Sequence, residues 1–223
     1  MEPPLTDVEV RLLGSLVEKQ ATTPDSYPLS LSALTAACNQ TSNREPVMRL
    51  DEATVDQAAT ALRRRSLLRT IQPIGSRVMK YEHLLEEVLD LDARERAVLG
   101  VLMLRGAQTA GELHARTARL AAFADIAQLE ATLEALMARE QGALVVRLPR
   151  RPGQREVRYA HLLSGDAAAV TAADAAEAPR AAAPARAEAA DERVAALERA
   201  VEELRAELAA LRAELVAFRE QFG

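Results

Sequence analysis

The chain has 223 residues, of which 49 % are hydrophobic and 27 % are charged, so it is long enough for two small domains with buried cores. Aromatic residues make up only 3 % and Trp is absent, which argues against an aromatic-lined ligand cavity or a base-stacking platform. The single cysteine, Cys38, excludes a disulfide framework, and together with three His it is too little for a zinc ribbon, so we expect no metal and no cofactor. No apolar run is long enough to cross a membrane and no basic-then-apolar leader begins the chain, so we expect a cytoplasmic protein without a membrane partner.

The net charge of −5 is unevenly distributed along the chain. Residues 1–88 carry 10 basic and 12 acidic side chains, residues 89–165 carry 11 and 9, and residues 166–223 carry 7 and 12. A protein that coats DNA through bulk electrostatics is strongly basic, and this chain is not. Any contact with nucleic acid is therefore expected to use local clusters of arginine.

The first three-quarters of the chain contain an internal repeat. The sequence LTDVEVRLLG at 5–14 corresponds to LDARERAVLG at 91–100, and KYEHLL at 80–85 corresponds to RYAHLL at 158–163. Between these ends the offset of matching positions changes from 86 to 79, 74 and 78, which places the insertions in loops. The repeat predicts one small fold built twice.

In the first unit a helix begins at Thr6 or Asp7, a short helix covers 30–38, a longer one covers about 52–67, and two strands cover 68–72 and 77–84. The second unit has the same order, with a helix from Asp92, helices at 109–117 and about 126–139, and strands at 144–148 and 155–162. Asp51 and Asp125 are predicted to cap the third helices. We predict a mainly α fold with small β-hairpins (α+β), made of two tandem winged-helix domains at 1–88 and 89–165.

Three stretches resemble a known family: CNQTSNREPV at 38–47, RGAQTAGEL at 105–113 and LPRRPGQREVRYAHLL at 148–163. They are similar to the YceH-like bacterial proteins over about residues 5–165. The resemblance implies tandem winged helices but no known activity, because that family is largely uncharacterised.

The remaining residues form two further segments. Residues 166–190 include 15 alanines and two prolines and are predicted to be a linker. Residues 191–223 show an apolar heptad repeat, which predicts a coiled coil and a homo-oligomer. The repeat positions are Val194, Leu197, Val201, Leu204, Leu208, Leu211, Leu215 and Phe218. Their flanking charges favour a parallel dimer, with a trimer, or a helix packed along its own domain, as the alternatives.

Candidate DNA contacts follow from the winged-helix prediction, because the third helix of that fold often enters the major groove and the hairpin contacts phosphate. In the first unit they are Arg63 and Arg64, near the end of the third helix, and Arg77 on the hairpin. Cations at a helix C-terminus are equally explained by the helix dipole. In the second unit the candidates lie on one hairpin, where arginine also protects a solvated edge strand. They are Arg147, Arg150, Arg151 and Arg155.

The polar loop 39–45 supplies the remaining candidates. Asn39, Asn43 and Arg44 are suited to bond base edges or a peptide backbone, although Asn39 is equally suited to cap the preceding helix. His83 and His161 occupy matching places, which indicates a shared structural role.

No motif for nucleotide binding, nucleophilic catalysis or zinc catalysis occurs, so we expect no enzyme activity. The leading hypothesis is a dimeric protein that binds double-stranded DNA, of the kind that regulates transcription. The alternative is a module that docks a protein partner without touching DNA.

Overall fold

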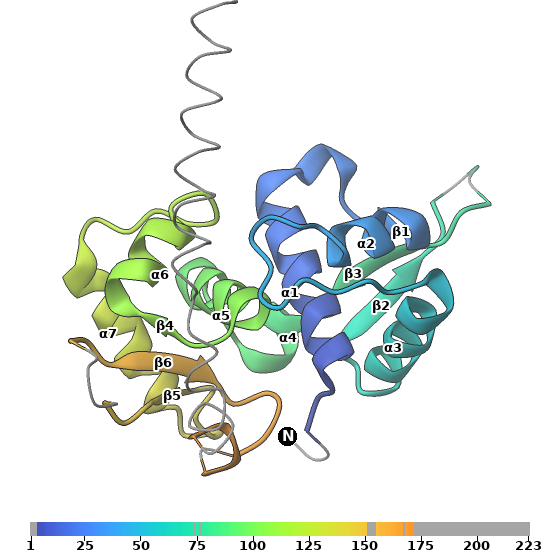
Figure 1. Cartoon of the computed structure of the whole chain (residues 1–223). Coiled ribbons are helices and arrows are strands. Elements are labelled where there is room, and N and C mark those ends of the chain that lie inside the picture. Colours follow the sequence, from blue (N-terminus) through green and yellow to red (C-terminus); the bar gives the residue numbers. More distant parts are fainter. Residues whose placement is uncertain (1–3, 74, 76, 151–154, 167, 172–223) are drawn as a thin grey trace, which may run out of the picture. The chain divides into compact units, whose positions relative to one another are not determined.

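The computed structural model describes residues 4–73, 75, 77–150, 155–166 and 168–171, all within one compact unit. These residues form helices and two small antiparallel sheets, which confirms the predicted mixture of helices and hairpins (Figure 1). Among them, no helix is both long enough and apolar enough to span a membrane. The predicted coiled-coil positions and nearly all of the predicted linker lie outside the described residues.

The same order of elements occurs twice in the described chain. The first half contains α1 (Asp7–Thr22), a short 3-10 helix (Pro24–Ser26), β1 (Leu29–Ser30), α2 (Leu31–Cys38), α3 (Glu52–Arg64), β2 (Leu68–Ile71) and β3 (Lys80–His83). After α4 (Leu85–Leu89), the second half contains α5 (Ala93–Arg105), β4 (Gln108–Thr109), α6 (Ala110–Thr117), α7 (Ile126–Met137), β5 (Val145–Arg147) and β6 (Arg158–His161).

Side-chain caps fix where the helices begin. Thr6 and Asp92 each form a capping box with a glutamate three residues later, at the starts of α1 and α5. Asp51 and Asp125 cap α3 and α7, as the sequence predicted. The third helices end earlier than predicted, and α3 stops before Ser66, whose φ of 57° is left-handed and cannot continue a right-handed helix.

Each hairpin is joined by a third strand that the sequence did not reveal. The strand orders are β1-β3-β2 and β4-β6-β5, because the two residues just before α2 and α6 pair with the last strand of their own half. Tyr81 lies opposite Leu29, and its repeat equivalent Tyr159 lies opposite Gln108. The two tyrosines, which the repeat predicts to be equivalent, therefore pair with equivalent strand positions in the two sheets.

The two halves pack through α1 and α5, which lie side by side in the middle of Figure 1. Two glycines at equivalent repeat positions permit this close approach. A Cβ on Gly14 would lie 3.0 Å from the Cβ of Met103, and a Cβ on Gly100 would lie 2.7 Å from Cγ1 of Val17. Since Met103 is the repeat equivalent of Val17, the contact is reciprocal, like the self-complementary interface of a twofold dimer.

Candidate functional site

The hairpin β5–β6 and the residues beside its strands carry three exposed arginines of the second half. Arg147 ends β5, and Arg150 and Arg155 follow it along the chain, all three with exposed side chains. Arg151 lies outside the described residues. Arg158 belongs to β6, is half-buried, and donates from Nη2 to the carbonyl oxygen of Ala107 at 2.6 Å. The hairpin therefore presents a short row of guanidinium groups, of the kind that binds phosphate.

A second group of exposed arginines lies on the first half. Arg63 and Arg64 occupy the last turn of α3, and Arg77 precedes β3. Arg69 of β2 is different, because it forms an ion pair with Glu82 on the neighbouring strand. Arg63, Arg64 and Arg77 are the predicted site residues of this half that face solvent.

The third helices expose carboxylates. Asp51 and Glu52 stand at the start of α3, and Asp125 caps α7, whose exposed face carries Glu130 and Glu134 further along. The N-terminal residues of a recognition helix are the ones that contact base edges in the major groove. Carboxylates at that place repel the DNA backbone, so the charge of these helices disfavours groove insertion through either of them.

The loop 39–50 is tied into the fold at both ends. Asn39 caps the C-terminus of α2, its Nδ2 donates to the carbonyl of Leu50 at 2.7 Å, and its Oδ1 accepts from the Leu50 amide at 2.7 Å. The side chain of Asn39 is thus used to close the loop, in agreement with the structural alternative weighed from the sequence.

Arg44 lies inside the protein, with 4 % of its surface exposed. Its guanidinium donates to the carbonyl of Ala37 and forms a 2.6 Å ion pair with Glu18, which also pairs with Arg119 of the second half. Burial raises the pKa of Glu18, but the hydrogen bonds and charges of Arg44 and Arg119 outweigh it and leave that pKa below its usual value. Arg44 therefore joins the loop to Glu18, and Glu18 in turn joins the first half to Arg119 of the second.

The buried side chain of Arg11 also makes hydrogen bonds to this loop and to the helix before it. It is 1 % exposed and donates to the carbonyls of Cys38 and Pro46, at 3.3 and 2.6 Å. Burial, followed by the charge of Arg44, lowers the pKa of Arg11. The loop thus encloses two buried guanidinium groups, which fixes its path.

Asn43, the third predicted residue of the loop, connects it to α5. Its backbone is left-handed, with φ of 59°, and its Oδ1 accepts from Nη2 of Arg105 at 2.8 Å. The amide of Glu45 donates to the carbonyl of Leu104 at 2.8 Å. These two contacts hold the loop against the end of α5, beside a pocket of about 380 Å³.

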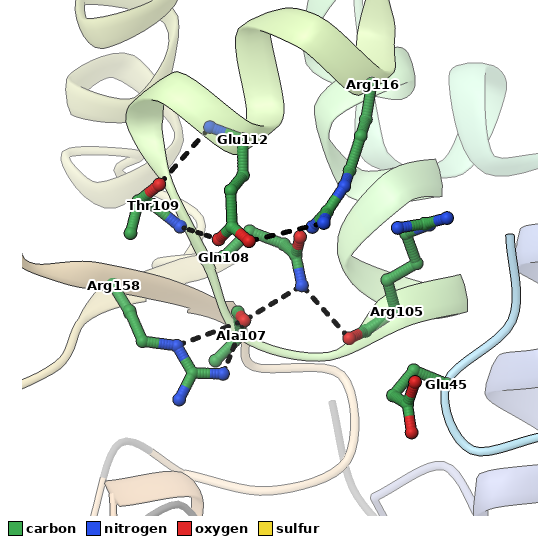
Figure 2. Close-up of a pocket in the computed structure, with 8 residues that line it drawn as sticks. All are labelled: Glu45, Arg105, Ala107, Gln108, Thr109, Glu112, Arg116 and Arg158. Carbon is green, nitrogen blue, oxygen red and sulfur yellow. Dashed lines mark hydrogen bonds and ion pairs between the residues drawn. The ribbon is translucent and has the colours of Figure 1, made fainter. Parts of the chain in front are cut away.

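Figure 2 shows this pocket, which the sequence did not indicate. It is lined by Glu45 from the first half and by residues of α5, β4, α6 and β6 from the second. Arg105, Arg116 and Arg158 bring three guanidinium groups to it, and Glu112 pairs with Arg116 at 3.2 Å. The side chain of Gln108 reaches its centre.

The two repeat-related histidines make the same backbone contact. Nδ1 of His83 accepts from the amide of Leu85, and Nδ1 of His161 accepts from the amide of Leu163, both at 3.3 Å. Burial, with the charge of Arg96 in the case of His83, lowers the pKa of each histidine to about 4. This matches the shared structural role expected from the repeat.

Cys38 is fully buried, and burial raises the pKa of its thiol, as for an inert core cysteine. In the part of the chain that the structure describes, no group of three His, Cys, Asp or Glu side chains is arranged to hold a metal ion.

Comparison with known proteins identifies the family. Residues 5–154 match the family described as "Protein of unknown function, DUF480". The chain belongs to the DUF480 family. This agrees with the resemblance to YceH-like proteins found in the sequence.

Curated relatives of this DUF480 chain are bacterial UPF0502 proteins. The one from Dechloromonas aromatica (strain RCB) is 53 % identical over 164 residues, which cover 74 % of this chain and 76 % of the relative. The one from Geotalea daltonii is 52 % identical over 182 residues and 82 % of each chain. A third, from Vibrio atlanticus, is 50 % identical over 170 residues, covering 74 % and 78 %.

Sequence reasoning missed the charged residues that the fold buries. Arg11 and Glu18 are seven residues apart on α1 and therefore lie on the same face of the helix. Charged residues on one helix face normally indicate that this face is exposed to solvent. Arg105 and Gln108 lie in the stretch 105–113 that resembles the YceH-like family, but the resemblance assigns them no role. Their place in the pocket depends on the tertiary structure, for which the sequence offers no local signal.

Proposed function

We propose that this chain is a non-enzymatic, cytoplasmic protein that binds double-stranded DNA, of the kind that regulates transcription, and that its two halves act as tandem winged helices. The element order helix, strand, helix, helix, hairpin in each half supports the winged-helix assignment. The contacts are made to backbone phosphates by the β5–β6 hairpin, with Arg63, Arg64 and Arg77 as a second contact region.

The observation that carries this proposal is the row of exposed arginines on the second hairpin. Arg147 and Arg155 form no hydrogen bond or ion pair with other described residues, so their guanidinium groups are available to phosphate. Asp51 and Glu52 at the start of α3 and Asp125 at the start of α7 disfavour insertion of these helix ends into the major groove, so we expect binding with little preference for base sequence.

The proposal is tested by measuring duplex affinity as a function of salt concentration, using fluorescence anisotropy with the full chain. Replacing Arg147 and Arg155 with Ala should weaken binding to every duplex and reduce the slope of log affinity against log salt by roughly 0.9 for each lost phosphate contact. The matched control replaces two exposed arginines elsewhere, Arg49 and Arg94, and should leave the slope unchanged. Equal slopes for both double variants would reject the hairpin as the contact.

A second function is favoured by the acidic third helices. Glu130 and Glu134 on α7 form a surface suited to a basic segment of a protein partner, in which case the chain docks that partner without touching DNA. This predicts no duplex binding at physiological salt. It also predicts a co-purifying protein that survives nuclease treatment and is lost when Glu130 and Glu134 become Lys.

We further propose that residues 191–223 form a parallel coiled-coil homodimer, which doubles the number of arginines presented to one duplex. Analytical ultracentrifugation of the full chain tests this. Replacing Leu204 and Leu208, two inner positions of the heptad repeat, with Glu should convert a dimer into a monomer. A parent chain that sediments as a monomer at micromolar concentration would remove the dimer from the proposal.

A further inference from the structure

The pocket between the loop 39–50 and the second half has the dimensions of a small-molecule site. Its volume of about 380 Å³ lies within the roughly 300–1,000 Å³ that such sites occupy. Seven of its eight lining residues are polar or charged, and Ala107 is the exception (Figure 2). A ligand for this pocket is therefore small and polar.

Gln108 supplies an acceptor that the chain leaves unused. The residue is 6 % exposed, and its Nε2 donates to the carbonyls of Arg105 at 3.1 Å and Ala107 at 2.9 Å, which fixes the orientation of the amide. Its Oε1 is buried and accepts no hydrogen bond from the described residues. Buried acceptors nearly always accept a hydrogen bond, so we expect this oxygen to accept one from an N–H or O–H group outside the chain.

The arginines of the pocket supply donors for an anion. Arg105 uses one N–H for Asn43, and Arg116 pairs with Glu112, while a guanidinium has five N–H groups to give. Burial, followed by the charges of Arg116 and Arg119, lowers the pKa of Arg105. An anion bound beside Arg105 would relieve that repulsion between like charges.

The balance of charge limits which anion fits. Arg105, Arg116 and Arg158 face Glu45 and Glu112, which leaves one net positive charge among the lining residues. This matches a single carboxylate, whereas the two glutamates repel a phosphate dianion. The same glutamates attract a cationic group on the ligand.

We propose that this pocket binds a free polar α-amino acid. The carboxylate lies on the guanidinium groups of Arg105 and Arg116, and the ammonium group donates to Oε1 of Gln108, with Glu45 as a second acceptor facing the same space. The proposal does not depend on DNA binding, since none of the exposed hairpin arginines lines the pocket.

Isothermal titration calorimetry of the full chain with each polar L-amino acid in turn tests the proposal. At least one should bind with micromolar to millimolar affinity. Its methyl ester, which lacks the carboxylate charge, and its N-acetyl derivative, which lacks the ammonium, should each bind at least about tenfold more weakly, the loss expected for one charge-assisted hydrogen bond. Acetate and inorganic phosphate serve as simple anions. No binding by any amino acid, or phosphate binding as tight as the best amino acid, overturns the proposal.

Matched variants locate the binding. Arg105→Gln and Arg116→Gln should each weaken the amino acid at least about tenfold. Arg94→Gln is the control, because Arg94 lies on the same helix as Arg105, is exposed, and does not line the pocket. Unliganded thermal melts establish that each variant folds, and Arg116, being half-exposed, provides a test that does not disturb the contact between Arg105 and Asn43. Unchanged affinity in both folded pocket variants overturns the proposal.

Discussion

Replacing Gly100 with Ala tests how the two halves are joined. Gly100 lies on α5 where that helix meets α1, and a Cβ there would be 2.7 Å from Cγ1 of Val17, closer than two carbon atoms can approach. Val17 is 1 % exposed and β-branched, so it has little freedom to move aside. We expect α1 and α5 to be forced apart, with loss of packing along the contact that joins the halves.

The expected magnitude is the difference of two effects. Overpacking a close-packed core costs about 1–3 kcal/mol. Removing a glycine from a helix interior returns about 1 kcal/mol, because alanine loses less conformational entropy on folding. The variant should therefore be less stable by up to about 2 kcal/mol, which corresponds to a fall of up to about 1 M in the urea midpoint if the slope is about 2 kcal/mol/M.

The assay is urea unfolding of the full chain followed by far-ultraviolet circular dichroism, with Gly111→Ala as the control. Gly111 is exposed on α6, and a Cβ there meets nothing within 4 Å. The control should keep the parent's stability or gain up to about 1 kcal/mol from helix propensity alone. The control is thus expected to be at least as stable as the parent, and Gly100→Ala to be less stable than the control.

A double variant separates steric conflict from other causes. Val17→Ala removes the atom that the new Cβ would meet, so Gly100→Ala should cost less in that background, with a coupling free energy of at least about 1 kcal/mol. If Gly100→Ala gains stability as Gly111→Ala does, or if the two substitutions are additive, the close reciprocal packing of α1 and α5 is refuted.

Three further predictions concern buried polar groups. Because the folded pKa of Glu18 is depressed, its stabilisation is present above the unfolded pKa and disappears as the pH falls through the folded value, so Glu18→Gln should be less stable than the parent at neutral pH, and the difference should shrink as the pH falls below about 4.3; a constant difference across the range would contradict the ion pair with Arg44. The pKa values of His83 and His161 lie near 4, so both residues take up protons more readily in the unfolded chain. The free energy of unfolding in urea should therefore fall between pH 6.5 and 4, by at most about 1.4 kcal/mol per pH unit for each histidine. Replacing both with Gln should flatten this profile. Asn39→Ala removes both hydrogen bonds that close the loop and should cost about 1–3 kcal/mol, measured as a lower urea midpoint together with faster proteolysis within residues 40–49.

Local signals in the sequence predicted the elements well. Thr6, Asp51, Asp92 and Asp125 each begin a helix because a short polar side chain accepts from the free amides of the first turn, an interaction that needs no distant partner. The internal repeat predicted the same order of elements in both halves, and the structure has that order. The matching glycines and the matching tyrosines also occupy equivalent places in the two halves.

The tertiary structure decided the roles of the charged side chains. From the sequence alone, Arg44 and Asn43 have the character of a polar binding loop, yet one is buried against Glu18 and the other is bonded to Arg105 of the second half. The pocket around Gln108 likewise exists only where the loop meets α5. A helix cap depends on residues three positions apart, so the sequence by itself determines it. Whether an arginine is buried, paired or exposed depends on residues far along the chain, which only the tertiary structure brings together.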